Sequence, residues 1–218
     1  MFLLDLLFPN RCLNCNRIIG AEEIICVLCY DQIEFTHHQF EEENLLKERC
    51  RVLFPIENAF ALMKFEEESV SRKIIHQLKY GKREKIGKIL ANWVSERLNF
   101  GNSVPDLIIT VPLHPKKLKE RGYNQLHLFA NTISEKLHIP CDHQLIKRNF
   151  YQSAQAKKNK EQRFTKENLF GITKNISGKH ILIIDDVFTT GNTMNAVAWE
   201  ILKNSGNQVS ILIIAVDS

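Results

Sequence analysis

Residues 181–193, Ile-Leu-Ile-Ile-Asp-Asp-Val-Phe-Thr-Thr-Gly-Asn-Thr, carry the clearest structural pattern in the chain. The four apolar residues at the start predict a strand that is buried on both faces, as in a parallel sheet. Two adjacent carboxylates, Asp185 and Asp186, follow at the carboxyl end of this strand, and residues 189–193 predict a short loop that opens a helix. Because open α/β sheets bind ligands just outside the carboxyl ends of their strands, this loop is a candidate binding site.

The loop has the chemistry of a phosphate site beside a sugar site. A helix N-terminus offers unpaired N–H groups and a partial positive charge, threonine hydroxyls add donors, and a glycine lets the backbone approach an anion. The paired carboxylates can accept hydrogen bonds from sugar hydroxyls. We therefore expect a sugar phosphate, with its sugar over the carboxylates and its phosphate on Thr189, Thr190, Gly191, Asn192 and Thr193. The simpler alternative is a buried strand whose acids only cap the next helix.

This segment resembles the motif of the type I phosphoribosyltransferases that binds 5-phosphoribosyl-1-pyrophosphate (PRPP). That motif consists of four hydrophobic residues, two acids and a Thr-Thr-Gly-x-Thr loop. The resemblance implies that Asp185 and Asp186 hold the ribose hydroxyls and are the catalytic residues, that residues 189–193 hold the 5′-phosphate, and that Mg²⁺ accompanies PRPP. A second buried strand at 106–111 and the helix patterns around it predict an α/β fold, a type I phosphoribosyltransferase-like doubly wound parallel sheet.

Four of the six cysteines form a paired pattern, Cys12-x2-Cys15-x10-Cys26-x2-Cys29. Each pair can place two thiolates on a tight turn, and two such turns complete a closed tetrahedral site for a structural Zn²⁺. Redox-active CxxC pairs or plain buried cysteines are the alternatives, but no thioredoxin-like βαβ pattern surrounds the cysteines. We therefore expect an N-terminal helix and zinc-ribbon module over residues 1–45, followed by a phosphoribosyltransferase-like domain over residues 46–218.

The composition is that of an ordinary soluble globular protein, with 218 residues, 44% hydrophobic, 25% charged, and a formal net charge of +4. This mildly basic balance does not by itself imply nucleic-acid binding. No apolar run reaches the length of a membrane span, so no membrane insertion is expected. Residues 1–9 are apolar but contain Asp5 and lack the basic start of a signal peptide, and they predict a short amphipathic helix in a cytoplasmic protein.

A second candidate anion site follows the strand at 106–111. There a basic loop with a glycine leads into a helix, and such a corner offers N–H groups and positive charge to an anion. In phosphoribosyltransferases the corresponding loop holds pyrophosphate, and the resemblance suggests this role for Arg121, Gly122, Asn124 and Gln125. His114 alone is a weak catalytic candidate, and each lysine of the loop could equally be a solvated surface charge.

A long basic and polar segment at 147–163 contains few aliphatic residues and predicts an exposed loop. Long loops inside compact domains are commonly functional lids or disordered. By its position the segment corresponds to the loop that closes over the ligand in phosphoribosyltransferases, where it could neutralise departing pyrophosphate. The residues assigned to it are Gln155, Lys157, Lys158 and Arg163. The alternative is a groove for nucleic-acid phosphates, with Phe150 and Tyr151 available for stacking.

In combination, these motifs resemble the ComF family of competence-associated phosphoribosyltransferase-like proteins. The shared features, in chain order, are the Leu-Leu-Asp-Leu-Leu-Phe-Pro start, the four-cysteine ribbon, Leu78-Lys79-Tyr80, residues 111–115, residues 121–125 and the terminal PRPP motif. The resemblance implies PRPP as a ligand and a role in DNA uptake and natural transformation. It also implies handling of single-stranded DNA, with DNA-uptake or recombination proteins as partners.

Three functions fit these residues. The first is a PRPP- and single-stranded-DNA-binding protein of DNA uptake. The second is an active phosphoribosyltransferase that transfers phosphoribosyl from PRPP to an unidentified acceptor and releases pyrophosphate, although no residue stands out as a general acid or base. The third is a non-catalytic PRPP-sensing regulator. Salt-dependent affinity for oligonucleotides, pyrophosphate release and PRPP-dependent partner binding, respectively, would distinguish them.

Overall fold

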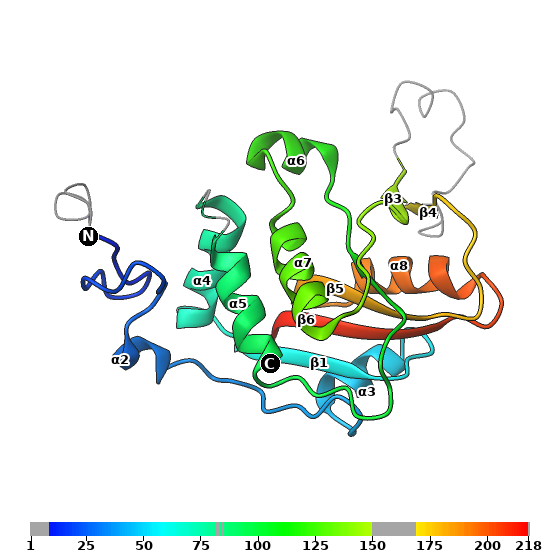
Figure 1. Cartoon of the computed structure of the whole chain (residues 1–218), viewed down its shortest axis with the longest axis horizontal. Coiled ribbons are helices and arrows are strands. Elements are labelled where there is room, and N and C mark those ends of the chain that lie inside the picture. Colours follow the sequence, from blue (N-terminus) through cyan, green and yellow to red (C-terminus); the bar gives the residue numbers. More distant parts are fainter. Residues whose placement is uncertain (1–8, 82, 84, 150–168, 218) are drawn as a thin grey trace.

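The computed structural model describes residues 9–81, 83, 85–149 and 169–217 of the chain. Helices separate the strands of the main sheet along the sequence, and Figure 1 shows their arrangement. Their bounds are α2 Val27–Tyr30, α3 Leu45–Arg51, β1 Ala59–Phe65, α4 Val70–Tyr80, α5 Lys85–Ser95, β2 Leu107–Thr110, α6 Pro115–Arg121, α7 Gln125–Leu137, β3 Ile146–Arg148, β4 Phe170–Ile172, β5 His180–Phe188, α8 Asn192–Leu202 and β6 Gln208–Asp217. None of the described helices has the length and apolar character needed to cross a bilayer.

The centre of the fold is a four-stranded parallel sheet with the strand order β1-β6-β5-β2. The pairing of β5 with β6 continues to Phe188↔Val216, whereas its pairing with β2 ends at Thr110↔Ile184. Residues 185–188 of β5 therefore extend beyond the end of β2. The short strands β3 and β4 form a separate antiparallel pair.

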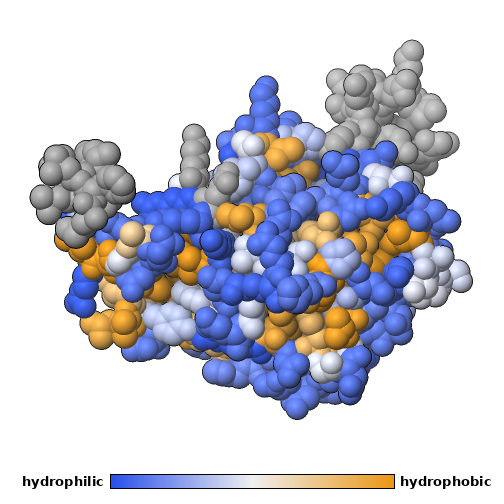
Figure 2. Space-filling view, in the orientation of Figure 1, coloured by the Kyte–Doolittle hydropathy of each residue, from blue (hydrophilic) through white to orange (hydrophobic). Residues whose placement is uncertain are grey.

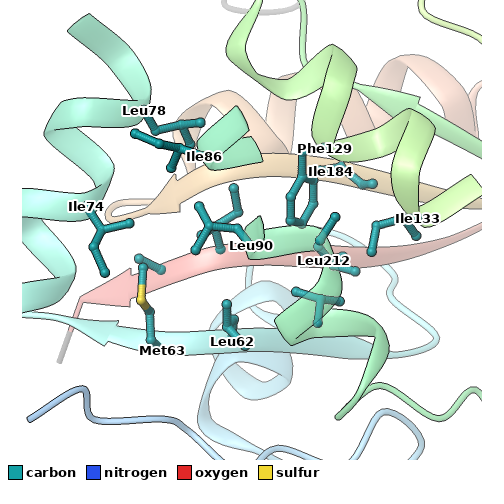
Figure 3. Packing of buried hydrophobic residues seen from close by; sticks show 14 of the residues in the cluster. Leu62, Met63, Ile74, Leu78, Ile86, Leu90, Phe129, Ile133, Ile184 and Leu212 are labelled. Carbon is teal, nitrogen blue, oxygen red and sulfur yellow. The ribbon is translucent and has the colours of Figure 1, made fainter. Parts of the chain in front are cut away.

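Both faces of the sheet are covered, which explains why its strands are nearly continuous apolar runs. Side chains that point to one face, such as Leu62, Ile184 and Leu212, pack in one cluster with α4, α5 and α7, as Figure 3 shows. Side chains that point to the other face, such as Ile183 and Ile211, pack in a second cluster with α3 and α8. The expected doubly wound α/β sheet is confirmed.

Local sequence signals explain several element boundaries. Ser69 caps α4 by accepting a hydrogen bond from the backbone N–H of Arg72. Two details differ from the sequence expectation. The basic loop before α7 contains the short helix α6, which ends at the left-handed Gly122, and β5 runs past the carboxylates to Phe188 because β6 continues to pair with it.

The cysteine-rich N-terminal module, called the ribbon below (residues 9–35), lies at one end of the molecule beside α4 and α5 (Figure 1). Lys73 of α4 donates to Asn14 Oδ1 at 2.7 Å, and Lys85 of α5 donates to the carbonyl of Ala21 at 3.0 Å. The ribbon side chains buried in the α4–α5 cluster include Ile24, Ile25 and Ile33. The ribbon is therefore packed on the sheet domain. Residues 1–8 of the expected amphipathic helix lie outside the described residues.

Candidate functional site

Two loops meet at the carboxyl edge of the sheet, because β2 and β5 are parallel neighbours. The loop after β2 leads through α6 to α7, and the loop after β5 leads directly into α8. Both candidate anion sites named from the sequence therefore lie at this edge. Asp185 and Asp186 stand between them, on the stretch of β5 that extends beyond β2.

Asp186 points to the face of the sheet that α4 and α7 cover, because both of its side-chain partners come from these helices. Different elements bind the two oxygens of the buried Asp186. Lys79, near the end of α4, forms an ion pair with Oδ1 at 2.8 Å, and Gln125, at the start of α7, donates from Nε2 to Oδ2 at 2.5 Å. This carboxylate thus joins α4, α7 and β5.

The hydrogen-bonded network continues from Asp186 to α6. Arg121 is 8% exposed, donates from Nη1 to Gln125 Oε1 at 2.8 Å, and places its guanidinium 4.9 Å from the centre of the Tyr80 ring. Its Nε atom is buried and has no hydrogen-bond partner in the part of the chain that the structure describes. A buried donor without a partner costs free energy until an acceptor reaches it. This corner therefore favours an anionic ligand.

Asp185 has surroundings that favour its neutral form. Burial and the neighbouring charge of Asp186 raise the pKa of Asp185 to about 8, against the opposing effects of the Asp186 N–H and of Lys79 and Lys117. The Asp186 N–H donates to Asp185 Oδ1 at 2.8 Å. At neutral pH the carboxyl pair therefore holds a proton, so it can both accept from and donate to the hydroxyls of a bound sugar.

The loop after β5 has the form of an anion site at a helix start. Gly191 is the N-cap of α8, has a left-handed backbone (φ 71°), and has no side chain that could occupy the free N–H groups of the first turn. The exposed side chains around it are those of Thr189, Thr190, Asn192 and Thr193. The acids do not cap this helix, because they lie inside β5. The alternative in which they serve only as caps is therefore wrong.

A residue far away in the sequence braces this loop. Arg49 of α3 donates from Nη2 to the carbonyl of Thr189 at 2.5 Å, and it forms an ion pair with Asp217 at 2.8 Å. Its guanidinium lies 5.1 Å from the centre of the Phe188 ring. Arg49 therefore fixes the start of the loop against the end of β6. Sequence reasoning assigned no site role to Arg49 or to Lys79.

Replacing Gly191 by alanine should destabilise the protein. The added Cβ would lie 2.4 Å from Leu53 Cδ1 and 2.8 Å from the Phe188 ring, on a left-handed backbone. We expect a loss of about 2 kcal/mol in the free energy of unfolding, measured by urea denaturation. Gly122→Ala is the matched control, because Gly122 is also left-handed but has nothing within 4 Å of the added Cβ, which leaves only about 1 kcal/mol of backbone strain. Equal losses in the two variants would contradict the steric argument.

The four predicted zinc ligands come together in the ribbon. Their Sγ atoms all lie within 4.8 Å of one another; these ligands are Cys12, Cys15, Cys26 and Cys29. The Sγ atoms of Cys15 and Cys26 are 3.6 Å apart, and a tetrahedral Zn²⁺ with Zn–S bonds of about 2.3 Å places its sulfurs roughly 3.8 Å apart. Asn16, directly after the first cysteine pair, has a left-handed backbone (φ 64°), and Asn14 donates to Cys29 Sγ at 3.3 Å. The cluster therefore fits a zinc ion.

The loop residues named from the sequence have different positions. Arg121 and Gln125 form the network that reaches Asp186, whereas Gly122 ends α6 and Asn124 caps α7. The residues assigned to a closing loop, together with the two aromatics beside them, lie outside the described residues; they are Phe150, Tyr151, Gln155, Lys157, Lys158 and Arg163.

Two protein-family models match the chain. A phosphoribosyl transferase domain matches residues 127–217, which include β5, its loop and α8. A double zinc ribbon domain matches residues 3–40, which include the whole cysteine cluster. Together with the parallel sheet and the thiol geometry, these matches identify a phosphoribosyltransferase-like domain behind a zinc-ribbon module.

Several curated proteins are similar to the chain. DNA utilization protein YhgH of Shigella flexneri is 32% identical over 149 residues, which cover 63% of this chain and 63% of that protein. Competence protein ComFC of Bacillus subtilis is 38% identical over 109 residues, 48% of this chain and 42% of that protein. Competence protein F of Haemophilus influenzae is 31% identical over 112 residues, 50% and 49% of the two chains. The chain thus spans less than two thirds of the length of these relatives.

Proposed function

Because the chain belongs to the ComF family, we propose that it binds PRPP at the carboxyl edge of its sheet and acts in DNA uptake or utilisation. The observation that carries the PRPP proposal is the meeting of an open helix start, a carboxyl pair and a buried arginine at one edge. The names of the relatives, which refer to DNA utilization and competence, support the biological role.

Each part of PRPP has a matching group at this edge. The 5′-phosphate would accept hydrogen bonds from the N–H groups at the start of α8, beside the exposed threonine hydroxyls. The ribose hydroxyls would bind the carboxyl pair of Asp185 and Asp186. The pyrophosphate would lie toward Lys79 and Arg121, where it would compete with Asp186 for the lysine ammonium.

The two metals have different roles in this proposal. Zn²⁺ would be structural, because four cysteines leave no open position on the ion, and a reducing compartment such as the cytoplasm would keep the thiols available. Mg²⁺ would enter with PRPP and be held mainly by its phosphate oxygens. In support, the cysteine cluster is the only group of three or more possible metal-ligating residues within the described ranges.

PRPP binding can be tested by isothermal titration in the presence of Mg²⁺. We expect the Asp185→Asn/Asp186→Asn variant to bind PRPP at least about tenfold more weakly, because amides are poorer acceptors for the ribose hydroxyls. Asp106→Asn is the matched control, since Asp106 is a carboxylate at the amino edge of the same sheet, paired with Lys179. Absence of binding to the wild-type protein, or equal binding by both variants, would overturn the proposal.

The same samples distinguish a transferase from a sensor. In a transferase, the carboxyl pair would steady the positive charge that develops on the ribose ring as pyrophosphate leaves. Pyrophosphate release from PRPP with a candidate acceptor, lost in the Asp185→Asn/Asp186→Asn variant, would establish turnover. PRPP binding without release, but with PRPP-dependent capture of a partner protein, would establish the regulatory alternative.

Single-stranded DNA binding is the second part of the proposed function. The relatives' names, which refer to DNA utilization and competence, support it, and the exposed Lys116, Lys117 and Lys119 of α6 are one candidate set of phosphate contacts. Binding through phosphates should weaken steeply with salt, because each contact releases a counterion. Fluorescence anisotropy of a labelled oligothymidine, measured between about 50 and 200 mM salt, tests this salt dependence.

A further inference from the structure

A cavity of about 670 Å³ lies where the ribbon meets the last turn of α4 and the start of α5. Its volume is in the range of ligand sites, about 300–1,000 Å³. The polar residues that line it are Asn10, Arg11, Asn16, Gln77, Arg83 and Lys85. None of the described residues in its lining is acidic. Figure 2 shows strongly hydrophilic residues on the surface between the ribbon and α4.

Three cations from different parts of the chain converge on this cavity, here called the junction cleft. Arg11 belongs to the ribbon, Arg83 lies between α4 and α5, and Lys85 begins α5. Arg11 donates to the carbonyl of Asn16 at 3.0 Å, and Lys85 donates to the carbonyl of Ala21 at 3.0 Å. These bonds hold the two side chains in place but do not neutralise them, because a carbonyl carries no net charge.

None of the three cations forms an ion pair with a carboxylate of the described residues. Convergent positive charge with low-dielectric walls concentrates the potential in a cleft and attracts anions. Guanidinium and ammonium groups are the usual donors to phosphate oxygens. The junction cleft therefore has the chemistry of a phosphate site.

We propose that the junction cleft binds backbone phosphates of single-stranded DNA. The inference rests on the proposed function, to which it gives a location. The described residues of the lining include no aromatic side chain on which a base could stack, so their contacts would be made to the backbone and would not depend on sequence. A concave site with cations from three places suits a backbone better than α6, whose exposed lysines stand on a single helix beside Glu120.

The test is anisotropy of a labelled oligothymidine with the full, zinc-loaded chain. The cleft variant is Arg11→Gln/Arg83→Gln/Lys85→Gln. One matched variant, Lys136→Gln/Lys174→Gln/Lys203→Gln, removes the same charge from remote surfaces, and another, Lys116→Gln/Lys117→Gln/Lys119→Gln, removes it from α6. We expect only the cleft variant to bind the strand about tenfold more weakly or worse. Its plot of log affinity against log salt should also be shallower by about 2, because each of the three lost phosphate contacts contributes about 0.7 to the slope.

Each outcome decides the matter. Equal losses in the cleft and remote variants would indicate a general charge effect, and a loss confined to the α6 variant would place the strand there; both overturn the inference and leave DNA binding intact. Thymidine monophosphate that competes as well as the strand would identify a free nucleotide instead and also overturn it. A wild-type protein that binds no oligothymidine would overturn the DNA-binding proposal together with the inference.

Zinc content and circular dichroism check that the cleft variant folds. Arg83→Glu provides a second variant, because the Arg83 side chain makes no hydrogen bond or ion pair with other described residues and its replacement disturbs no ribbon contact. Charge reversal at this one position should still weaken strand binding by several-fold, on the order of one phosphate contact. Unchanged binding by Arg83→Glu in a folded, zinc-loaded protein would count against the junction cleft.

Discussion

Zinc removal with a chelator should unfold the ribbon while leaving the parallel sheet in place. The ribbon has little structure of its own beyond the four-residue helix α2, and it exposes Ile18, Val27 and Leu28. A module this small depends on its metal, and structural zinc sites of small peptides contribute apparent free energies of about 10–16 kcal/mol at pH 7. Cys29→Ser should have the same effect, because Cys29 is buried within the cluster.

Trp93 provides a direct measurement of this loss. Its ring packs edge-on against Tyr30 at 5.1 Å and against Phe35 at 6.2 Å, and both partners belong to the ribbon end of the chain. In a Trp199→Phe background, chelation should shift the Trp93 emission to longer wavelength, as its environment becomes wetter. Cys141→Ser is the matched control, since Cys141 lies outside the cluster. An unchanged Trp93 spectrum in protein freed of zinc would show that the ribbon folds without metal.

The architecture could largely be predicted from the sequence, because the strands that form it are buried on both faces. The run at 181–184 is apolar throughout, and the strand at 106–111 has a continuous apolar stretch at 107–109, which is typical of a covered parallel sheet. The cysteine cluster was equally predictable, since paired spacing leaves few alternatives. The pattern could not show that β5 continues to Phe188, because that length depends on pairing with β6.

The candidate site was only partly predictable. Motif spacing placed Asp186, Arg121 and Gln125 in functional segments, but it did not show that Gln125 bonds directly to Asp186. Lys79 had one signal, its place in the Leu78-Lys79-Tyr80 stretch shared with the ComF family, yet only the packing of α4 shows its partner. No sequence signal pointed to Arg49, because it contacts a loop 140 residues later in the chain and does so only through the tertiary fold.

The physical reason is the same in each case. Periodicity and capping signals report which face of an element is buried and where it starts or ends, within a window of a few residues. Contacts such as Lys79–Asp186 depend on the relative placement of α4 and β5, which is set by the whole cluster of side chains between them. Sequence therefore predicts the segments that form this site, and packing decides which of their polar atoms meet.

Lys79→Met should cost about 3 kcal/mol of unfolding free energy at pH 8, because it leaves the buried Asp186 without its counter-ion. Methionine keeps the apolar stem of the lysine, so the loss reports the charge. Asp186→Asn in the same background should recover most of the loss, since an amide needs no counter-ion. Urea denaturation of the four proteins in this cycle measures the coupling between the two residues.

The loss of unfolding free energy caused by Lys79→Met should also depend on pH, and the carboxyl pair determines whether it grows or shrinks as the pH rises. Burial and Asp186 raise the pKa of Asp185 to about 8, and Lys79 acts against that shift, so the pKa rises further without the lysine. For an acid whose folded-state pKa is raised, the stabilising contribution is complete below the unfolded pKa and is lost as pH rises through the folded one. Lys79→Met should therefore cost less at pH 5 than at pH 8. An equal cost at both, with no recovery by Asp186→Asn, would mean that Lys79 acts through packing alone.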